Sequence, residues 1–373
     1  AILASKELLD EVIVKELDEV RERYGDERRS EIVEAEGEIS IEDLVPDEEV
    51  VVTVSHAGYV KRVPLSEYRS QGRGGKGLRA MDTRDQDFVS WVFVVNAHAH
   101  VLFLSDKGKA YLKKVYQIPE TSRAARGRAV VNLVGMEPDE RVAAILPIRE
   151  FVEDGYLLTC TRRGRVKRTN LSAYANIRQN GIIGVAIDDG DGLLTARIVT
   201  PGEHVLIGTS HGMSIRFPIE DVRSMGRVSM GVKGIDLRDG DFVIGMDIIE
   251  GGGEQQVLTV SANGYGKRTK VAEWRTQGRG GKGIIGMDTS ERNGALVKLR
   301  LVSPEDQLMV ITNGGQVIRT RVSEIRETGR NTQGVRVIRL RDGEQVVDVE
   351  PVAEGEEDEV LEGAEESGEP GPN

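Results

Sequence analysis

The strongest constraint on this fold is an internal repeat of about 50 residues that occurs six times. Each unit opens with an apolar run, a turn that contains glycine, and a second short run that is usually basic. The openings lie at 51–62, 101–112, 157–168, 205–216, 257–268 and 308–319. Their turn glycines are 50, 56, 48, 52 and 51 residues apart. A fixed period of this length is typical of solenoids and propellers.

The residues inside each unit predict β-structure. Alternating Val, Ile, Leu and Thr flank the turn, which predicts a β-hairpin whose glycine takes a positive φ. A glycine-bearing loop and two further strands follow, for example at 231–237 and 242–249. The turn glycines are Gly58, Gly108, Gly164, Gly212, Gly264 and Gly315.

Four strands per unit make a blade, and six blades bury their faces by closing into a ring or a shallow spiral. We therefore expect an all-β, six-bladed, propeller-like domain over residues 50–352. Helical repeats are disfavoured because Gly and β-branched residues are too frequent. Kelch and WD propellers have related periods, but their double-glycine and Trp-Asp signatures do not recur here.

The two ends differ from the repeats. Apolar residues at three- and four-residue spacing predict an amphipathic helix over 5–24, capped by Ser5 and ended by Gly25. We assign residues 1–31 to this helical segment and 32–49 to an acidic linker. Residues 353–373 are rich in Glu, Gly and Pro, and we expect a disordered acidic tail. The sequence begins without Met, so we expect it to be cut from a longer chain.

Charge is segregated along the chain. Residues 1–49 carry 6 basic and 18 acidic residues, and residues 353–373 carry 9 acidic and no basic residues. The repeats between them carry 44 basic and 35 acidic residues. A basic body between acidic ends indicates a polyanion-binding surface with flanking segments that could compete for it.

Several classes of protein are disfavoured. The single cysteine, Cys160, excludes an intramolecular disulfide and a cysteine-based zinc site, and we expect it buried in a strand in a reducing cytoplasm. No apolar run is long enough to span a bilayer, and no secretory signal opens the chain. His98 and His100 share one strand face, but no third metal ligand is near. No catalytic constellation stands out.

One heptapeptide, QGRGGKG, occurs at 71–77 and again at 277–283, at the same place in units one and five. Its four glycines permit unusual φ values and bring backbone amides close to a ligand. Its Arg can donate two parallel N–H bonds to phosphate oxygens, and its Lys provides a compact positive charge. The side-chain amide of its Gln is a further hydrogen-bonding group. Such a loop holds a nucleic-acid backbone without reading bases.

Three other interpretations apply to a glycine-rich basic loop. The heptapeptide is not a nucleotide P-loop, because Lys76 and Lys282 are followed by Gly. A disordered RNA-binding segment and a purely structural glycine turn remain open. The same Arg and Lys in both copies favour a phosphate-binding role.

The heptapeptide resembles the box of the DNA gyrase A family, written Gln-basic-Arg-Gly-Gly-basic-Gly, although Gly72 and Gly278 replace the basic second residue. The resemblance spans residues 1–352. It implies that the six units are blades of a β-pinwheel domain that wraps DNA, and that the leading helix ends the preceding cleavage domain.

The resemblance, with the recurrence of basic residues at equivalent blade positions, assigns DNA-binding residues. The first box is Gln71, Gly72, Arg73, Gly74, Gly75, Lys76 and Gly77, and the second is Gln277, Gly278, Arg279, Gly280, Gly281, Lys282 and Gly283. The basic rim is Lys61, Arg62, Lys113, Lys114, Arg123, Arg126, Arg128, Arg163, Arg165, Lys167, Arg168, Arg227, Lys233, Lys267, Arg268, Arg330 and Arg336.

The implied function is sequence-independent binding, bending and wrapping of double-stranded DNA, which gives gyrase its negative supercoiling. The implied partners are the gyrase A cleavage domain of the same chain and the gyrase B subunit of an A2B2 holoenzyme, in the bacterial cytoplasm at the nucleoid and away from membranes. This chain would bind no cofactor and catalyse nothing alone. The catalytic tyrosine, the ATPase, Mg²⁺ and ATP belong elsewhere in the holoenzyme.

Two rivals remain. A domain of the topoisomerase IV type would bind DNA without strong wrapping, but the box is degenerate or absent there. A protein-interaction propeller would use aromatic or acidic pockets at the ring centre, and aromatic residues are only 4% of this chain.

Overall fold

The computed structural model describes residues 6–25, 42–65, 89–122, 125–251, 255–314 and 316–352. The chain divides into two compact units, Ala1–Leu44 and Val45–Asn373. The first box, Gln71–Gly77, lies outside the described residues, as do Arg123, the tail 353–373 and part of the expected linker. Their assignments therefore stay predictions.

The first unit contains a single α-helix among its described residues, α1 (Lys6–Tyr24), followed later by a 3-10 turn, η2 (Glu42–Leu44). The helix matches the expected range to within one residue. The amide of Gly25 donates to Arg21 O at 2.8 Å and ends it. None of the helix residues is buried within the chain. In the described part of the chain, no helix is both long and apolar enough to cross a membrane.

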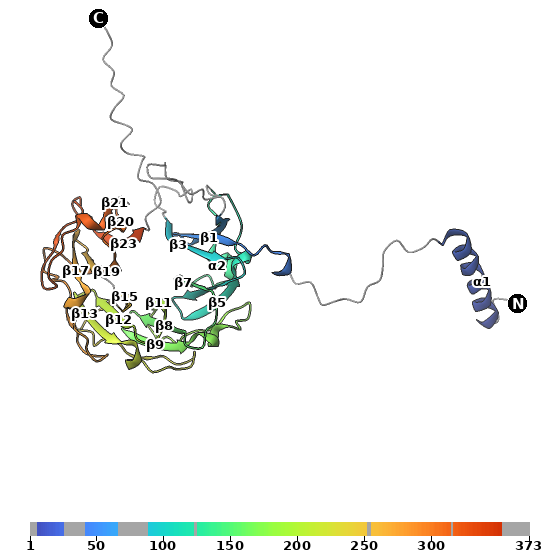
Figure 1. Cartoon of the computed structure of the whole chain (residues 1–373), viewed down its shortest axis with the longest axis horizontal. Helices are drawn as coiled ribbons and strands as arrows, with labels where there is room; N and C mark the ends of the chain where they lie inside the picture. The colour runs from blue at the N-terminus through green and yellow to red at the C-terminus, as the bar shows by residue number, and fades with distance from the viewer. Residues whose placement is uncertain are drawn as a thin grey trace, which may run out of the picture. The chain divides into compact units, whose positions relative to one another are not determined.

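The second unit is a ring of small antiparallel sheets, each built on a hairpin (Figure 1). Five of the predicted turn glycines are described, and all five have φ between 76° and 81°, which confirms that part of the prediction. The six hairpins are β1 (Glu49–Ser55) with β2 (Tyr59–Pro64), β4 (His100–Ser105) with β5 (Lys109–Lys114), β8 (Tyr156–Thr161) with β9 (Arg165–Asn170), β12 (His204–Thr209) with β13 (Met213–Pro218), β16 (Gln256–Ser261) with β17 (Tyr265–Lys270), and β20 (Gln307–Thr312) with β21 (Val317–Arg321).

An inner strand pairs with the first strand of every hairpin and faces the centre of the ring (Figure 1). A register shift recurs near the start of each inner strand, for example between Val260 and Ser261 of its partner β16. This repeated β-bulge bends the strand and increases its twist. The inner strands are β3 (Val89–Asn96), β7 (Val142–Ile148), β11 (Leu193–Val199), β15 (Val243–Ile249), β19 (Leu296–Val302) and β23 (Val346–Val352).

The outer strand of a blade comes from the following repeat. For example, Met213 of β13 pairs with Ile285 of the next unit. We expected four strands from each unit in its own blade; the strand number was right for five blades, but the ownership was wrong. The sixth sheet has three strands among the described residues, in the order β21-β20-β23. The outer strands are β6 (Arg128–Ala129), β10 (Ile182–Ile183), β14 (Val232–Lys233), β18 (Ile284–Ile285) and β22 (Val335–Arg336).

Short helical turns connect the hairpins to the loops that precede the outer strands. They are η4 (Val115–Gln117), η5 (Leu171–Tyr174), η6 (Ile219–Asp221), η7 (Val271–Glu273) and η8 (Val322–Glu324). The short helix α2 (Val130–Val134) instead follows the outer strand β6. The loops run from one blade to the next, so each repeat is tied to its predecessor by backbone hydrogen bonds.

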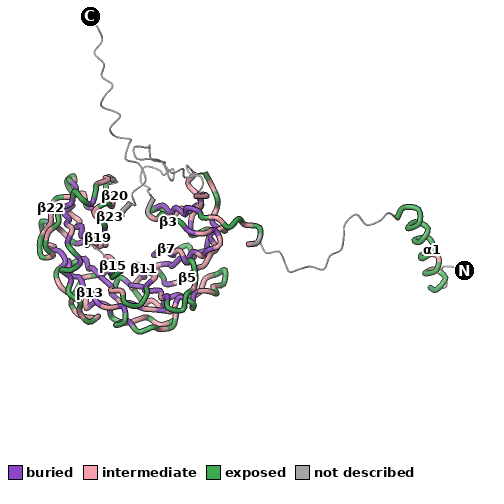
Figure 2. The backbone as a smooth tube through the Cα atoms, viewed as in Figure 1, coloured by how far each residue is buried: buried purple, intermediate pink, exposed green. Residues whose placement is uncertain are grey.

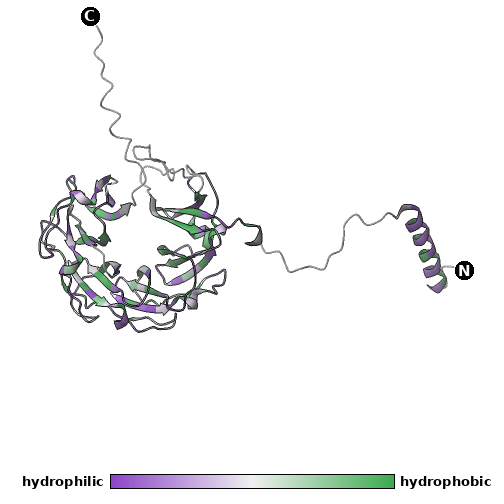
Figure 3. Cartoon of the chain, viewed as in Figure 1, coloured by the Kyte–Doolittle hydropathy of each residue, from purple (hydrophilic) through white to green (hydrophobic). Residues whose placement is uncertain are grey.

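The hydrophobic core lies within and between the blades (Figures 2 and 3). Strand β1 is buried along all its residues but the first, because both of its faces are covered. Cys160 is buried in β8, as predicted. The six-bladed, all-β prediction is confirmed.

Candidate nucleic-acid interface

The second box, Gln277–Gly283, links η7 to the outer strand β18 and so lies on the blade of the preceding unit. The amide of Gln277 donates to Arg216 O at 2.8 Å, and that of Gly280 donates to Gly234 O at 2.6 Å. Gly280 and Gly283 have φ of 75° and 73°. The expected positive φ values are therefore present at two glycines. The two amides hold the loop on the blade and do not face outward as we expected.

Two larger side chains fix the start of the loop. Trp274 is fully buried, and its Nε1 donates to Ser214 Oγ at 2.7 Å. The carbonyl oxygen of Trp274 accepts a hydrogen bond from Arg216 Nη1 at 3.3 Å. The start of this glycine-rich loop is therefore fixed to unit four by hydrogen bonds between Trp274 and the residues Ser214 and Arg216.

The box arginine and lysine play different parts. Arg279 donates from Nε to Asp221 O at 2.7 Å and from Nη1 to Lys233 O at 3.1 Å, both in the preceding unit. Lys282 is exposed. We expected the guanidinium of Arg279 to donate to phosphate with all of its N–H groups. Two of its nitrogens instead donate to protein carbonyls, whereas the ammonium of Lys282 faces solvent.

Equivalent arginines in the neighbouring loops make the same contact. Arg227 Nη1 donates to Ile183 O at 3.5 Å, and Arg330 Nη1 donates to Ile285 O at 2.7 Å. Each carbonyl belongs to the last residue of the preceding outer strand. This arginine therefore connects successive loops around the ring.

The rim assignment needs correction at three lysines. Lys61 and Lys267 are 0% exposed and Lys167 is 1% exposed. Lys267 Nζ donates to Gly329 O at 2.8 Å and to Arg330 O, and Lys167 Nζ donates to Gly184 O at 2.8 Å and to Arg227 O. These ammonium groups face inward, and each donates to at least one carbonyl in the loop of the next unit, so they do not present themselves to DNA.

Burial also sets the acidity of two of these lysines. Desolvation lowers the pKa of Lys167 from 10.5 to about 7, with a smaller contribution from the charge of Arg227. Desolvation likewise lowers the pKa of Lys267 to about 8. A charged ammonium in such a place must be hydrogen-bonded, and the loop carbonyls supply the partners.

The arginine after two of these lysines is also committed to the protein. Arg62 Nε donates to Ile118 O at 2.9 Å, and its Nη1 lies 2.6 Å from Glu120 Oε2. Arg268 donates to Ile325 O and Ser323 O of the next unit. Arg62 and Arg268, which we assigned to the DNA-binding rim, thus join adjacent blades through these contacts.

The remaining rim cations divide by exposure. Arg128, Arg163, Lys233 and Arg336 are exposed, while Lys113, Lys114, Arg126, Arg165, Arg168, Arg227 and Arg330 are half-buried. Some are paired, as Arg165 is with Asp188 at 2.7 Å and Lys233 with Asp236 at 2.8 Å. Exposed pairs of this kind are weak and can be exchanged for a phosphate partner.

Sequence reasoning missed a cluster on blade five. The guanidinium of Arg292 lies 4.4 Å from the centroid of the Tyr265 ring, and Arg336 Nη2 lies 3.2 Å from the Tyr265 hydroxyl. Arg339 lines the same hollow. Arg292 and Arg339 stand outside the repeated hairpin and box, so no periodic signal marked them.

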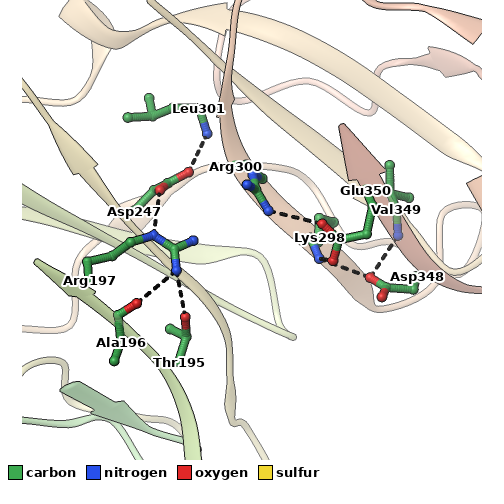
Figure 4. A network of polar contacts seen from close by, with 10 residues as sticks. All are labelled: Thr195, Ala196, Arg197, Asp247, Lys298, Arg300, Leu301, Asp348, Val349 and Glu350. Carbon is green, nitrogen blue, oxygen red and sulfur yellow. Dashed lines mark hydrogen bonds and ion pairs between the residues drawn. The ribbon is translucent and has the colours of Figure 1, made fainter. Parts of the chain in front are cut away.

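The ring centre carries paired charges. Arg197 meets Asp247 at 3.4 Å, while Lys298 lies 2.7 Å and Arg300 3.0 Å from Glu350 (Figure 4). These contacts join inner strands of successive blades and line a cavity of about 140 Å³. A centre with cations matched to carboxylates differs from the aromatic or acidic pocket expected of a protein-interaction propeller.

The two histidines do not form a metal site in the described structure. His98 Nε2 lies 2.9 Å from Val45 O, and the His100 ring packs edge-on against Phe151. No group of three or more metal-ligating His, Cys, Asp or Glu side chains occurs among the described residues.

Comparison with known families agrees with this geometry. The family model described as "DNA gyrase C-terminal domain, beta-propeller" matches residues 49–96, 99–149, 155–200, 203–250, 255–303 and 306–353. The chain belongs to this family. The matched segments follow the six repeats one by one.

Curated relatives agree. The DNA gyrase A protein of Staphylococcus aureus strain NCTC 8325 is 44% identical over 364 residues, which are 97% of this chain and 41% of the relative. The DNA gyrase A protein of Staphylococcus epidermidis strain ATCC 12228 is 44% identical over 95% of this chain and 40% of the relative. The chain thus spans about two fifths of the length of these relatives.

Solved structures share the fold. A DNA gyrase A C-terminal domain aligns with a TM-score of 0.63 and 28% identity, covering 82% of this chain and all of that one. A DNA topoisomerase IV C-terminal domain aligns with a TM-score of 0.73 and 24% identity, covering 83% of this chain and 94% of that one.

Proposed function

We propose that this chain binds double-stranded DNA without sequence specificity and bends it around the loops at the outer edge of the ring. The observation that carries the proposal is the box loop Gln277–Gly283, which is clamped to the preceding blade and leaves Lys282 exposed. Lys233 on β14 and Arg336 on β22, both exposed on the outer strands of the adjacent blades, extend the basic surface.

Phosphate contacts suit this arrangement better than base contacts. The outer strands are only two residues long, and no described helix or long ribbon projects from the ring to enter a major groove. Bending about 40 base pairs through a half-turn costs on the order of 10 kcal/mol. Many phosphate contacts spread over several blades would offset that cost.

In this proposal the domain serves a DNA gyrase. It would be joined to a gyrase A cleavage domain and would act with gyrase B in an A2B2 assembly in the bacterial cytoplasm, at the nucleoid. The catalytic tyrosine, ATP and Mg²⁺ would be supplied by other parts of that assembly. The wrap would bias strand passage toward negative supercoiling.

A ligation topology assay tests the proposal. Nicked plasmid is sealed by ligase with increasing amounts of the chain, and wrapping leaves a shift in linking number after deproteinisation. Binding is followed in parallel as a function of salt, where log K falls by about 0.9 for each phosphate neutralised per decade of salt. No linking-number shift, or a slope of only two to three phosphates, would reject wrapping.

A second candidate is a domain that binds DNA without strong wrapping, and it is favoured by the engagement of the box arginine, Arg279, with protein carbonyls. The same assay separates the two. A steep salt dependence without a linking-number shift would support this second candidate.

A further inference from the structure

A cluster of three arginines around one tyrosine lies at the outer edge of blade five. Tyr265 on β17 pairs with Arg336 on β22, and Arg292 covers the face of the Tyr265 ring. Together they form an open hollow of about 470 Å³ lined by Tyr265, Arg292, Arg336, Val337, Ile338 and Arg339. We name this hollow the tyrosine–arginine cup.

The cup has an excess of positive charge. No Asp or Glu is among the described residues that line it. The ion pairs among the described residues include none of its three arginines. Gathering three like charges without a counterion is unfavourable, so an anion in the cup would relieve their repulsion. Planar guanidinium groups favour phosphate oxygens because they donate in a fixed fork.

The cup is also held in shape. Arg292 Nη1 donates to Gln333 Oε1 at 3.0 Å, while Gln333 Nε2 donates to Ser290 Oγ at 3.0 Å. Asn293 is fully buried and donates to Gln333 O at 2.9 Å. The Tyr265 hydroxyl accepts from Arg336, which leaves its own hydrogen for an acceptor in the hollow.

The place of the cup connects it to the rim. Arg336 follows Gly334, the last residue of the unit-six loop, by two residues, just as Ile285 follows the second box. The cup therefore occupies the outer-strand position next to a rim loop, but on blade five rather than blade four. We propose that the tyrosine–arginine cup binds one phosphodiester group of duplex DNA, in addition to the box. This inference rests on the proposed function.

Two triple variants of the full chain test the cup. One carries R292Q, R336Q and R339Q. The matched control carries K15Q, R21Q and R23Q on α1, which removes the same charge outside the ring. Binding to a 40-base-pair duplex is measured between about 50 and 300 mM salt. We expect the salt slope of the cup variant to become shallower by about 0.9, the value for one phosphate, with the control slope unchanged.

A cup-variant slope equal to that of the unaltered chain would overturn the phosphate site and leave the proposed function intact. A shallow slope already in the unaltered chain would instead reject the proposed function. These two failures are therefore distinguishable.

Arginine footprinting of the unaltered chain is independent of variant folding. An arginine-selective reagent and mass spectrometry report the accessibility of the three cup arginines, with exposed Arg238 as reference. We expect DNA to protect the cup arginines more than Arg238. Equal protection of all four, or protection already complete without DNA because a carboxylate segment of the chain occupies the cup, would overturn the proposal.

Discussion

The box loop of unit five and the corresponding loop of unit six occupy the same place on adjacent blades but are anchored in different ways. The unit-six loop lies over Lys267, whose buried ammonium donates to its carbonyls. The box loop lies over Ile215, and Gly281 comes close to that side chain. One loop is held from below by a cation, and the other packs glycines against an apolar side chain. In both loops an arginine donates to the last residue of the preceding outer strand.

This difference shows that some cations of the ring anchor loops, whereas others stay exposed to a ligand. A buried lysine beneath a loop, such as Lys267, fixes that loop and cannot contact the ligand. The box loop has an apolar residue beneath it in place of that lysine, and its own Lys282 is exposed. Identical residue types therefore have opposite roles in neighbouring blades, and the following experiments test that contrast.

Removing the lysine anchor should have the largest effect. K267I makes blade five resemble blade four at this position, and it leaves the carbonyls of Gly329 and Arg330 without their donor. We expect the free energy of unfolding to fall by about 3 kcal/mol. Urea denaturation measures it. K270A, which alters an exposed lysine on the same strand, should change it by less than about 0.5 kcal/mol. Equal effects would remove the contrast between the two loops.

Variants of the box arginine and of the box lysine should change stability and DNA binding separately. R279Q and K282Q each remove one positive charge. R279Q should lower the free energy of unfolding by about 2 kcal/mol, because two hydrogen bonds from a charged group are lost, and leave the salt slope nearly unchanged. K282Q should leave stability unchanged and make the slope shallower by about 0.9.

Thermal denaturation and salt-dependent DNA binding on both variants check this separation. If R279Q flattened the salt slope as much as K282Q, the arginine would be a direct phosphate contact and its role as a tie between loops would be secondary.

Restoring a basic residue at the second box position should have a smaller, opposite effect. A Cβ on Gly278 meets no heavy atom within 4 Å, whereas one on Gly283 would clash with the carbonyl of Ser214. G278R should therefore be accepted and should make the salt slope steeper by about 0.9, which strengthens binding several-fold at low salt. G278Q is the neutral control. A steeper slope in both variants would show that charge is not responsible.

The last expected effect is a pH dependence of stability. Burial lowers the pKa of Lys167 from 10.5 to about 7. Between pH 7 and about 10 the unfolded chain then binds more protons than the folded chain, so the free energy of unfolding rises with pH. K167M should make this rise smaller, and the lowered pKa of Lys267, about 8, accounts for a rise that remains. Urea denaturation at pH 7, 8 and 9 compares the two proteins, and parallel curves would contradict the assignment.

The repeat alone was enough to predict six hairpin-based blades, because glycine turns and alternating apolar residues are local signals. It also located the second box between hairpin and outer strand. The roles of individual side chains could not be predicted as well from the sequence. A strand that reads Tyr59-Val60-Lys61-Arg62 looks half-exposed, yet Lys61 is fully buried because the loop of the next unit covers it.

What the sequence determined by itself is therefore the unit: its period, its turns, its segregated charge and its family. The tertiary structure decided which unit supplies each outer strand, which lysines face inward, and that Arg292 and Arg339 line one hollow with Tyr265. The physical reason is that period and propensity act within a repeat, whereas hydrogen bonding and burial at a blade edge depend on a neighbour about 50 residues away.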